Sequence, residues 1–134
     1  MPASLRVHHL AVVVEDLEHA LKFWRDALGL ELKAIENVSE QASQVAFLPA
    51  GEAEIELVQP TTADSGIARY MAKRGPGMHH ICLAASDLPG TLERLAALGI
   101  RLINPQPLTG SDGRRYAFIH PEGTGGVLVE LYQA

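Results

Sequence analysis

Two histidine pairs and two glutamates set in apolar segments are the residues of this chain best suited to chemistry. His8-His9 opens one apolar segment, and His79-His80 opens another 71 residues later. Glu56 and Glu130 recur inside two short apolar segments that both end in glutamine. Imidazole nitrogen and carboxylate oxygen suit divalent ions such as Co²⁺, Mn²⁺, Ni²⁺, Zn²⁺ or Fe²⁺, and the lack of thiolate ligands argues against a structural zinc site. The pattern predicts a metal site with one or two positions open to water or substrate.

The spacing of these residues indicates an internal duplication. The offset that relates the histidine pairs also relates Asp16 to Asp87 and Leu17 to Leu88. Each copy has roughly 60 residues and would be only marginally stable alone. We therefore expect the two copies to close over a shared surface, where an active cleft would form.

Strand geometry allows only one histidine of each pair to face such a cleft, because neighbouring side chains point to opposite faces. The repeat requires the same member in both copies, so the choice is His9 with His80 or His8 with His79. Alternation alone does not decide between them. A glutamate in an apolar strand, such as Glu130, is costly to bury unless it is paired or coordinated. Because histidine and glutamate recur together, the pattern favours metal ligands over isolated structural residues.

Both copies read as a strand, a helix and three further strands. Asp16 and Asp87 are expected to cap the two helices, and Gly29 and Gly99 to end them. The strands of the first copy are predicted at 5–14, 30–35, 44–48 and 54–58, and those of the second at 79–85, 101–103, 115–119 and 127–132. The segment 104–114 is expected to be a loop and a candidate lid.

Length and composition indicate a single domain. The 134 residues divide into a first module at about 5–60, a linker at 61–77 and a second module at about 78–134. A hydrophobic content of 47% and a net charge of −5 are ordinary for a globular protein and argue against nucleic acid as a partner. The start of the chain does not resemble a signal peptide, no stretch is long enough to span a bilayer, and Cys82 is expected to be a buried core residue. We expect a cytoplasmic protein.

Long segments around these residues resemble the vicinal oxygen chelate superfamily, which includes glyoxalases, bleomycin resistance proteins and dioxygenases. Within it, the similarity is greatest to methylmalonyl-CoA epimerases. The most specific segments are Lys73 to Ile81 and His120 to Leu131. The resemblance implies an α+β fold in which tandem βαβββ modules form a cupped, eight-stranded mixed sheet around a metal site.

The resemblance also implies ligands, cofactor and partners. It selects the second histidine of each pair, which makes the ligands His9, Glu56, His80 and Glu130, with either glutamine or glutamate allowed at position 56. A divalent ion, Co²⁺ first and Mn²⁺, Ni²⁺ or Zn²⁺ as alternatives, would stabilise the enolate formed when C2 of a small acyl-CoA substrate loses its proton. The family further implies a homodimer.

The proton carriers are less plainly marked. Some epimerases have a glutamate base at the position of Val45 in this chain. The remaining candidates are the ligand carboxylates Glu130 and Glu56, or Glu40 reaching in from a neighbouring segment. Glu130 is the preferred catalytic base.

Three arginines are candidates for binding the substrate. Arg114 and Arg115 lie at the end of the predicted lid, and Arg74 belongs to a short helical pattern that also carries Arg69 and Lys73. They could meet a carboxylate or the CoA phosphates, although charges on a helix more often form a solvated face. A glyoxalase I type lactoylglutathione lyase is the alternative enzyme, and an antibiotic-binding protein of the same fold is the alternative without catalysis.

Overall fold

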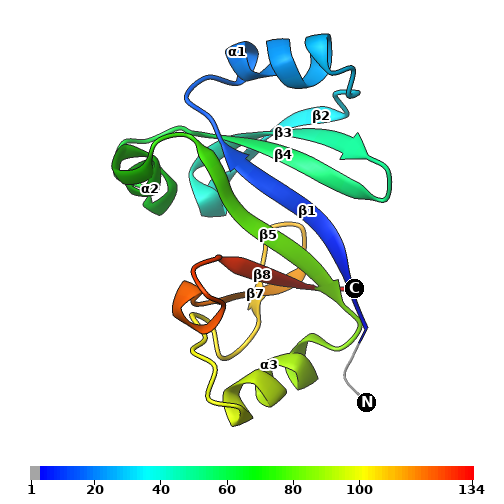
Figure 1. Cartoon of the computed structure of the whole chain (residues 1–134), viewed down its shortest axis with the longest axis vertical. Coiled ribbons are helices and arrows are strands. Elements are labelled where there is room, and N and C mark those ends of the chain that lie inside the picture. Colours follow the sequence, from blue (N-terminus) through cyan, green and yellow to red (C-terminus); the bar gives the residue numbers. More distant parts are fainter. Residues whose placement is uncertain (1–3) are drawn as a thin grey trace. The chain divides into compact units, whose positions relative to one another are not determined.

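The computed structural model describes residues 4–134 (Figure 1). Residues 1–3, which begin the segment considered above as a signal peptide, lie outside the described part. The described chain forms two compact units. The first unit comprises His9–His79, and the second comprises residues 4–8 together with His80–Ala134.

The first unit is built on four strands in the order β2-β3-β4-β1. Strand β4 runs parallel to β1 and antiparallel to β3, so the sheet is mixed. Two α-helices, α1 and α2, belong to this unit and are drawn in blue and green in Figure 1. The elements are β1 (Leu5–Val13), α1 (Leu17–Leu21), the π-helix η1 (Lys22–Ala27), β2 (Ala34–Val38), the 3₁₀-helix η2 (Ser39–Gln41), β3 (Ser43–Ala50), β4 (Ala53–Pro60) and α2 (Gly66–Arg74).

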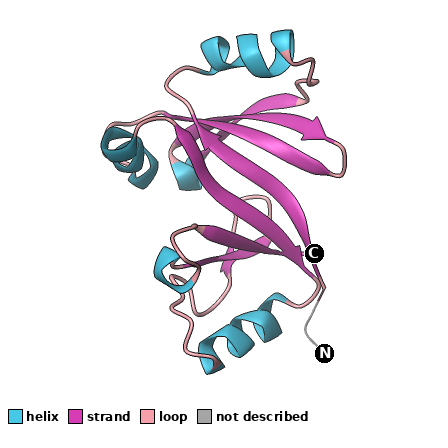
Figure 2. Ribbon diagram, in the orientation of Figure 1, coloured by secondary structure: helices cyan, strands magenta, loops and turns pink. Residues whose placement is uncertain are grey.

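The second unit repeats this arrangement with strands in the order β5-β8-β7-β6. Its elements are β5 (Gly77–Ala85), α3 (Leu88–Ala97), β6 (Leu108–Thr109), β7 (Arg115–Ile119), the 3₁₀-helix η3 (Pro121–Gly123) and β8 (Val129–Gln133). Strand β8 is parallel to β5 and antiparallel to β7. Figure 2 shows the same succession of strand, helix and strands in both units. The predicted α+β class with two βαβββ modules and eight strands is confirmed.

Four predicted elements differ in the structure. Leu30 and Leu32 pack against the core under α1 instead of pairing, so β2 begins only at Ala34. The segment 101–103 forms a single bridge, between Leu102 and Ile119, and is not a strand. The second strand of the second module is β6, which lies within the segment predicted to be a loop. The helix after Asp16 also widens into π-helix at Lys22, although Asp16 caps it as predicted.

Each helix of the repeat covers one face of its own sheet. Under α1, Leu17 and Leu21 pack against Ala46, Leu48 and Leu57. Under α3, Leu88 and Leu92 pack against Ala117, Ile119 and Leu131. Because side chains alternate along a strand, the residues beside Leu57 and Leu131 point to the opposite face. Glu56 and Glu130 therefore lie on the sheet faces that α1 and α3 leave uncovered.

The glutamine that ends each glutamate-containing strand ties that strand to a helix. Oε1 of Gln59 accepts a hydrogen bond from the backbone N–H of Leu17, at 2.8 Å. Oε1 of Gln133 accepts one from the N–H of Leu88, also at 2.8 Å. Both donors are among the first N–H groups of a helix, which have no partner inside the helix. The recurring glutamine is thus a structural part of the repeat.

We expect Gln133→Ala to lower the free energy of unfolding by about 1–2 kcal/mol, because the first turn of α3 loses an acceptor. Nε2 of Gln133 also donates to Ser86 O at 3.0 Å, so the variant loses a second bond between β8 and the start of α3. Denaturant unfolding monitored by circular dichroism measures the change. Gln44→Ala, at a half-buried glutamine of β3, serves as the control and should change stability by less.

Two further features bear on the remaining predictions. Cys82 is fully buried, as predicted for a core residue. Among the described residues, no helix has both the length and the apolar character that a membrane crossing needs.

Candidate active site

In the first unit, His9 and Glu56 form a buried pair on neighbouring strands. His9 on β1 is 1% exposed and Glu56 on β4 is 8% exposed. The strand register places Glu56 beside Ala11, two residues after His9, so the two long side chains meet across a diagonal. Nδ1 of His9 lies 3.0 Å from Oε2 of Glu56.

In the second unit, His80 and Glu130 form the corresponding pair. His80 on β5 is 4% exposed and Glu130 on β8 is 2% exposed. The register places Glu130 beside Cys82, again two residues after the histidine. Nε2 of His80 lies 3.0 Å from Oε1 of Glu130.

The repeat extends to the neighbours of the two glutamates. Phe47 on β3 lies beside Glu56, and Phe118 on β7 lies beside Glu130. The ring of Phe118 meets the imidazole of His80 edge to face, with 5.6 Å between the ring centroids. Aromatic packing of this kind limits the orientations open to the imidazole.

Each unit therefore offers one imidazole and one carboxylate that are close together and almost fully withdrawn from water. A buried carboxylate is stable only with a compensating partner such as a cation, a hydrogen-bond donor or a metal ion. Oxygen and nitrogen donors of this kind fit a divalent transition metal ion. The four residues predicted to be ligands form these two pairs, His9 with Glu56 and His80 with Glu130.

The other histidine of the first pair, His8, belongs to the second unit and is only partly buried. Nη1 of Arg114 lies 3.0 Å from Nε2 of His8. Since a guanidinium can only donate, Nε2 of His8 is the acceptor. The His8 ring also lies 4.9 Å from that of Tyr132, measured between centroids. His8 thus orients Arg114.

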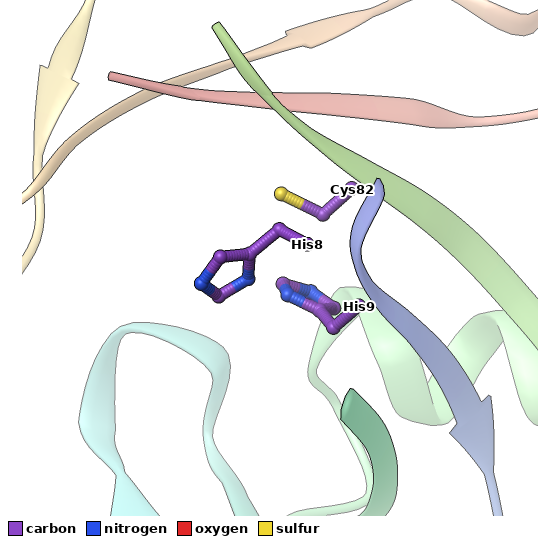
Figure 3. A group of neighbouring side chains, drawn as sticks. All are labelled: His8, His9 and Cys82. Atoms are coloured by element: carbon purple, nitrogen blue, oxygen red, sulfur yellow. The ribbon is translucent and has the colours of Figure 1, made fainter. Parts of the chain in front are cut away.

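Figure 3 shows His8 near Cys82, with His9 next along β1. A ring nitrogen of His8 and the sulfur of Cys82 lie within 4.8 Å of each other. His79, the other member of the second pair, is only partly buried and meets the ring of Tyr70 edge to face, with centroids 4.7 Å apart. In both pairs the first histidine contacts a tyrosine ring, and the second lies 3.0 Å from a glutamate oxygen.

The candidate substrate-binding residues lie at two places in the fold. Arg114 is exposed and holds its guanidinium over the ring of Tyr132, 5.1 Å from the centroid. Arg115, the next residue, is exposed at the start of β7. Arg74 ends α2 in the first unit, 5.4 Å from the centroid of the Tyr70 ring. Arg114 and Arg115 are neighbours in the second unit, whereas Arg74 lies in the first.

Of the proton-carrier positions, Val45 and Glu40 are the two outside the ligand pairs. Val45 is 1% exposed and packs with Ala11 and Val58 on the same sheet face as Glu56. Glu40 is exposed in η2, the turn between β2 and β3. Val45 is thus part of the apolar packing on this face of the sheet.

The chain belongs to the glyoxalase/bleomycin resistance protein/dioxygenase superfamily, whose model matches residues 8–118. Over 130 residues it is 36% identical to a mitochondrial methylmalonyl-CoA epimerase of Mus musculus, covering 96% of this chain and 73% of that protein. It is 35% identical to an ethylmalonyl-CoA/methylmalonyl-CoA epimerase of Cereibacter sphaeroides, covering 96% and 97%.

Solved structures give the same result. The crystal structure of methylmalonyl-CoA epimerase from Mycobacterium tuberculosis is 36% identical, with a TM-score of 0.85, and covers 95% of this chain and 86% of that one. These matches confirm the resemblance to epimerases that the sequence predicts.

Proposed function

We propose that this protein is a metal-dependent epimerase that interconverts (R)- and (S)-methylmalonyl-CoA. The observation that carries the proposal is the duplicated pair of buried histidine and glutamate, in a chain similar to methylmalonyl-CoA epimerases over nearly its whole length. We include in the proposal a single domain, a homodimer and a cytoplasmic location.

In this proposal His9, Glu56, His80 and Glu130 hold one divalent ion, with Co²⁺ first and Mn²⁺, Ni²⁺ or Zn²⁺ as alternatives. The ion, when bound, supplies positive charge that stabilises the enolate formed at the thioester. Two neutral imidazoles and two carboxylates leave the site with no net charge around a divalent ion. The four ligand residues are almost fully withdrawn from water.

The chain's own residues move the proton. Glu130 takes the proton from C2 on one face, and a second carboxyl group returns a proton to the other face, which inverts the centre. Glu56 and Glu40 are the candidates for this second group, since Val45 cannot carry a proton. In this proposal Arg114, which contacts His8 and Tyr132, binds the free carboxylate of the substrate.

The test is uptake of deuterium from D₂O into C2 of (R)- and of (S)-methylmalonyl-CoA, with protein reconstituted with Co²⁺. We expect exchange and inversion with both epimers. Isomerisation of the methylglyoxal–glutathione adduct, with no exchange into the thioester, would instead establish a lyase. Failure of the purified protein to retain any divalent ion, with no reaction after Co²⁺ is added, would favour a binding protein.

A further inference from the structure

The two units differ in a pair of side chains on the sheet faces that carry the glutamates. In the first unit, Val45 on β3 and Val58 on β4 are register partners on this face. In the second unit, Tyr116 on β7 and Tyr132 on β8 are register partners on the corresponding face. The two pairs occupy equivalent places, since Val58 and Tyr132 each follow the glutamate of their own strand by two residues. At this pair the second copy has two large rings where the first copy has two small aliphatic groups.

The two pairs also differ in how they are covered. Both valines are at most 2% exposed, and Ile67 of α2 packs against them. The two tyrosines are half-buried, so part of each side chain remains open to contact a ligand. At this position the glutamate-bearing face of the second unit therefore offers surface to a substrate.

The tyrosines belong to a row of aromatic contacts that ends at a proposed metal ligand. The rings of Tyr116 and Tyr132 lie 6.5 Å apart, measured between centroids. Tyr116 also meets Phe118 edge to face at 6.1 Å, and Phe118 meets His80 at 5.6 Å. Contacts of this kind limit how far each ring can turn. The row therefore forms a rigid border beside the His80–Glu130 pair.

Arg114 lies at the other end of this row. Its guanidinium lies 5.1 Å from the centroid of the Tyr132 ring, and its Nη1 lies 3.0 Å from Nε2 of His8. The backbone N–H of Arg114 donates to Oδ1 of Asp112 at 2.9 Å, which orders the turn before β7. A guanidinium held by a ring and an imidazole has few positions from which to bind a carboxylate.

The chemistry of the substrate connects Arg114 to the tyrosine rings. In a 2-alkylmalonyl thioester, C2 carries both the free carboxylate and the alkyl group. C2 must also come within reach of Glu130, which lies on the same face of β8 as Tyr132, two residues before it. A carboxylate bound by Arg114 and a proton facing Glu130 therefore place the alkyl group beside the tyrosine rings.

We propose that Tyr116 and Tyr132 are specificity-determining residues that restrict the C2 substituent of the substrate to a methyl group. The proposal rests on the proposed function, because that reaction is what holds C2 between Arg114 and Glu130. Each ring fills space that a valine would leave free, and the rings cannot move apart without losing their edge-to-face contacts. A longer substituent such as ethyl displaces C2 from the carboxylate that takes its proton.

The test places the residues of the first unit in the second. Tyr116→Val/Tyr132→Val removes both rings, whereas the control Tyr116→Phe/Tyr132→Phe keeps the rings and removes only the hydroxyl groups. Deuterium uptake gives kcat/KM for 2-methylmalonyl-CoA and 2-ethylmalonyl-CoA, and the ratio within one variant cancels a general loss of activity. We expect the unchanged protein and the phenylalanine variant to prefer the methyl substrate by roughly tenfold or more. The valine variant should prefer it by less than about threefold.

Three results would overturn the proposal. They are equal use of both substrates by the unchanged protein, an unaltered ratio in the valine variant, and loss of the preference in the phenylalanine variant. The last result would assign the selection to the hydroxyl groups and not to the size of the rings. Tyr116→Val alone leaves the ring under Arg114 in place and should lower the ratio by about threefold or more, so the test does not depend on the folding of the double variant.

Calorimetry with methylmalonate and ethylmalonate separates this inference from the proposed function, because both dianions carry the C2 substituent without a thioester. In the presence of Co²⁺, we expect the unchanged protein to bind methylmalonate roughly tenfold more tightly, and the valine variant to bind both within about threefold. This pattern in a protein without epimerase activity would reject only the proposed function. Epimerase activity with the same substrate ratio in all variants would reject only the role of the tyrosines.

Discussion

Replacement of His80 by alanine should remove the bound divalent ion and lower epimerase turnover by more than about 100-fold. Mutating a residue that only hydrogen-bonds to a metal ligand already lowers metal affinity or activity by about 10–100-fold. His80 is 4% exposed and contacts Glu130 at 3.0 Å, so its loss leaves a buried carboxylate without its imidazole partner. Elemental analysis of the purified variant and deuterium uptake measure the two effects.

His79→Ala is the matched control, because it removes the neighbouring imidazole of the same pair. His79 contacts the ring of Tyr70 and is not among the proposed ligands, so this variant should retain the metal and most of the turnover. Addition of Co²⁺ should raise the unfolding temperature of the control and leave that of His80→Ala unchanged. Full metal content and full turnover in His80→Ala would show that the proposed site is wrong.

Most of the fold could be predicted from the duplicated sequence, because the residues that begin and end each helix are local signals that recur in both copies. Asp16 and Asp87 accept hydrogen bonds from the first turns of their helices, and Gly29 and Gly99 adopt the positive φ expected after a helix. These features depend on a few consecutive residues, which a sequence displays directly.

Alternation did not reveal which histidine is buried, because both faces of β1 are apolar. Val12 and Val14 pack under α1, whereas Ala11 joins Val45 and Val58 on the other face. The choice depends on which face the helix covers, and this is a property of tertiary packing. The choice of the second histidine in each pair came from the resemblance to a family, not from the pattern of residues.

The second module shows where local signals fail. Arg101–Ile103 contains residues suited to a strand, but only Leu102 forms a bridge. Backbone N–H groups of Ile103 and Asn104 both donate to Phe118 O, which turns the chain away from regular pairing. The role of Gln59 and Gln133 was likewise hidden, because their partners lie 42 and 45 residues away.

Conversion of the two ligand glutamates to glutamine should separate metal binding from proton transfer. An amide keeps an oxygen ligand but cannot accept the C2 proton. We expect Glu130→Gln to lower turnover by roughly 10²–10⁴-fold, the usual contribution of a general base. If Glu56 acts only as a ligand, Glu56→Gln should lower turnover by less than about tenfold, because no general base is lost. Metal content and circular dichroism should remain near normal in both variants.

Deuterium uptake measured separately for each epimer then identifies the second carrier. If Glu130 removes the C2 proton on one face, Glu130→Gln should first stop deuterium uptake into one epimer. Loss of the second proton carrier should stop uptake into the other epimer. A selective loss in Glu56→Gln assigns that role to the ligand in the first unit, and a selective loss in Glu40→Gln assigns it to the exposed glutamate of η2. Full turnover in Glu130→Gln would remove Glu130 from proton transfer. It would leave the buried pairs as metal ligands only, because an amide can replace a carboxylate in binding an ion but not in carrying a proton.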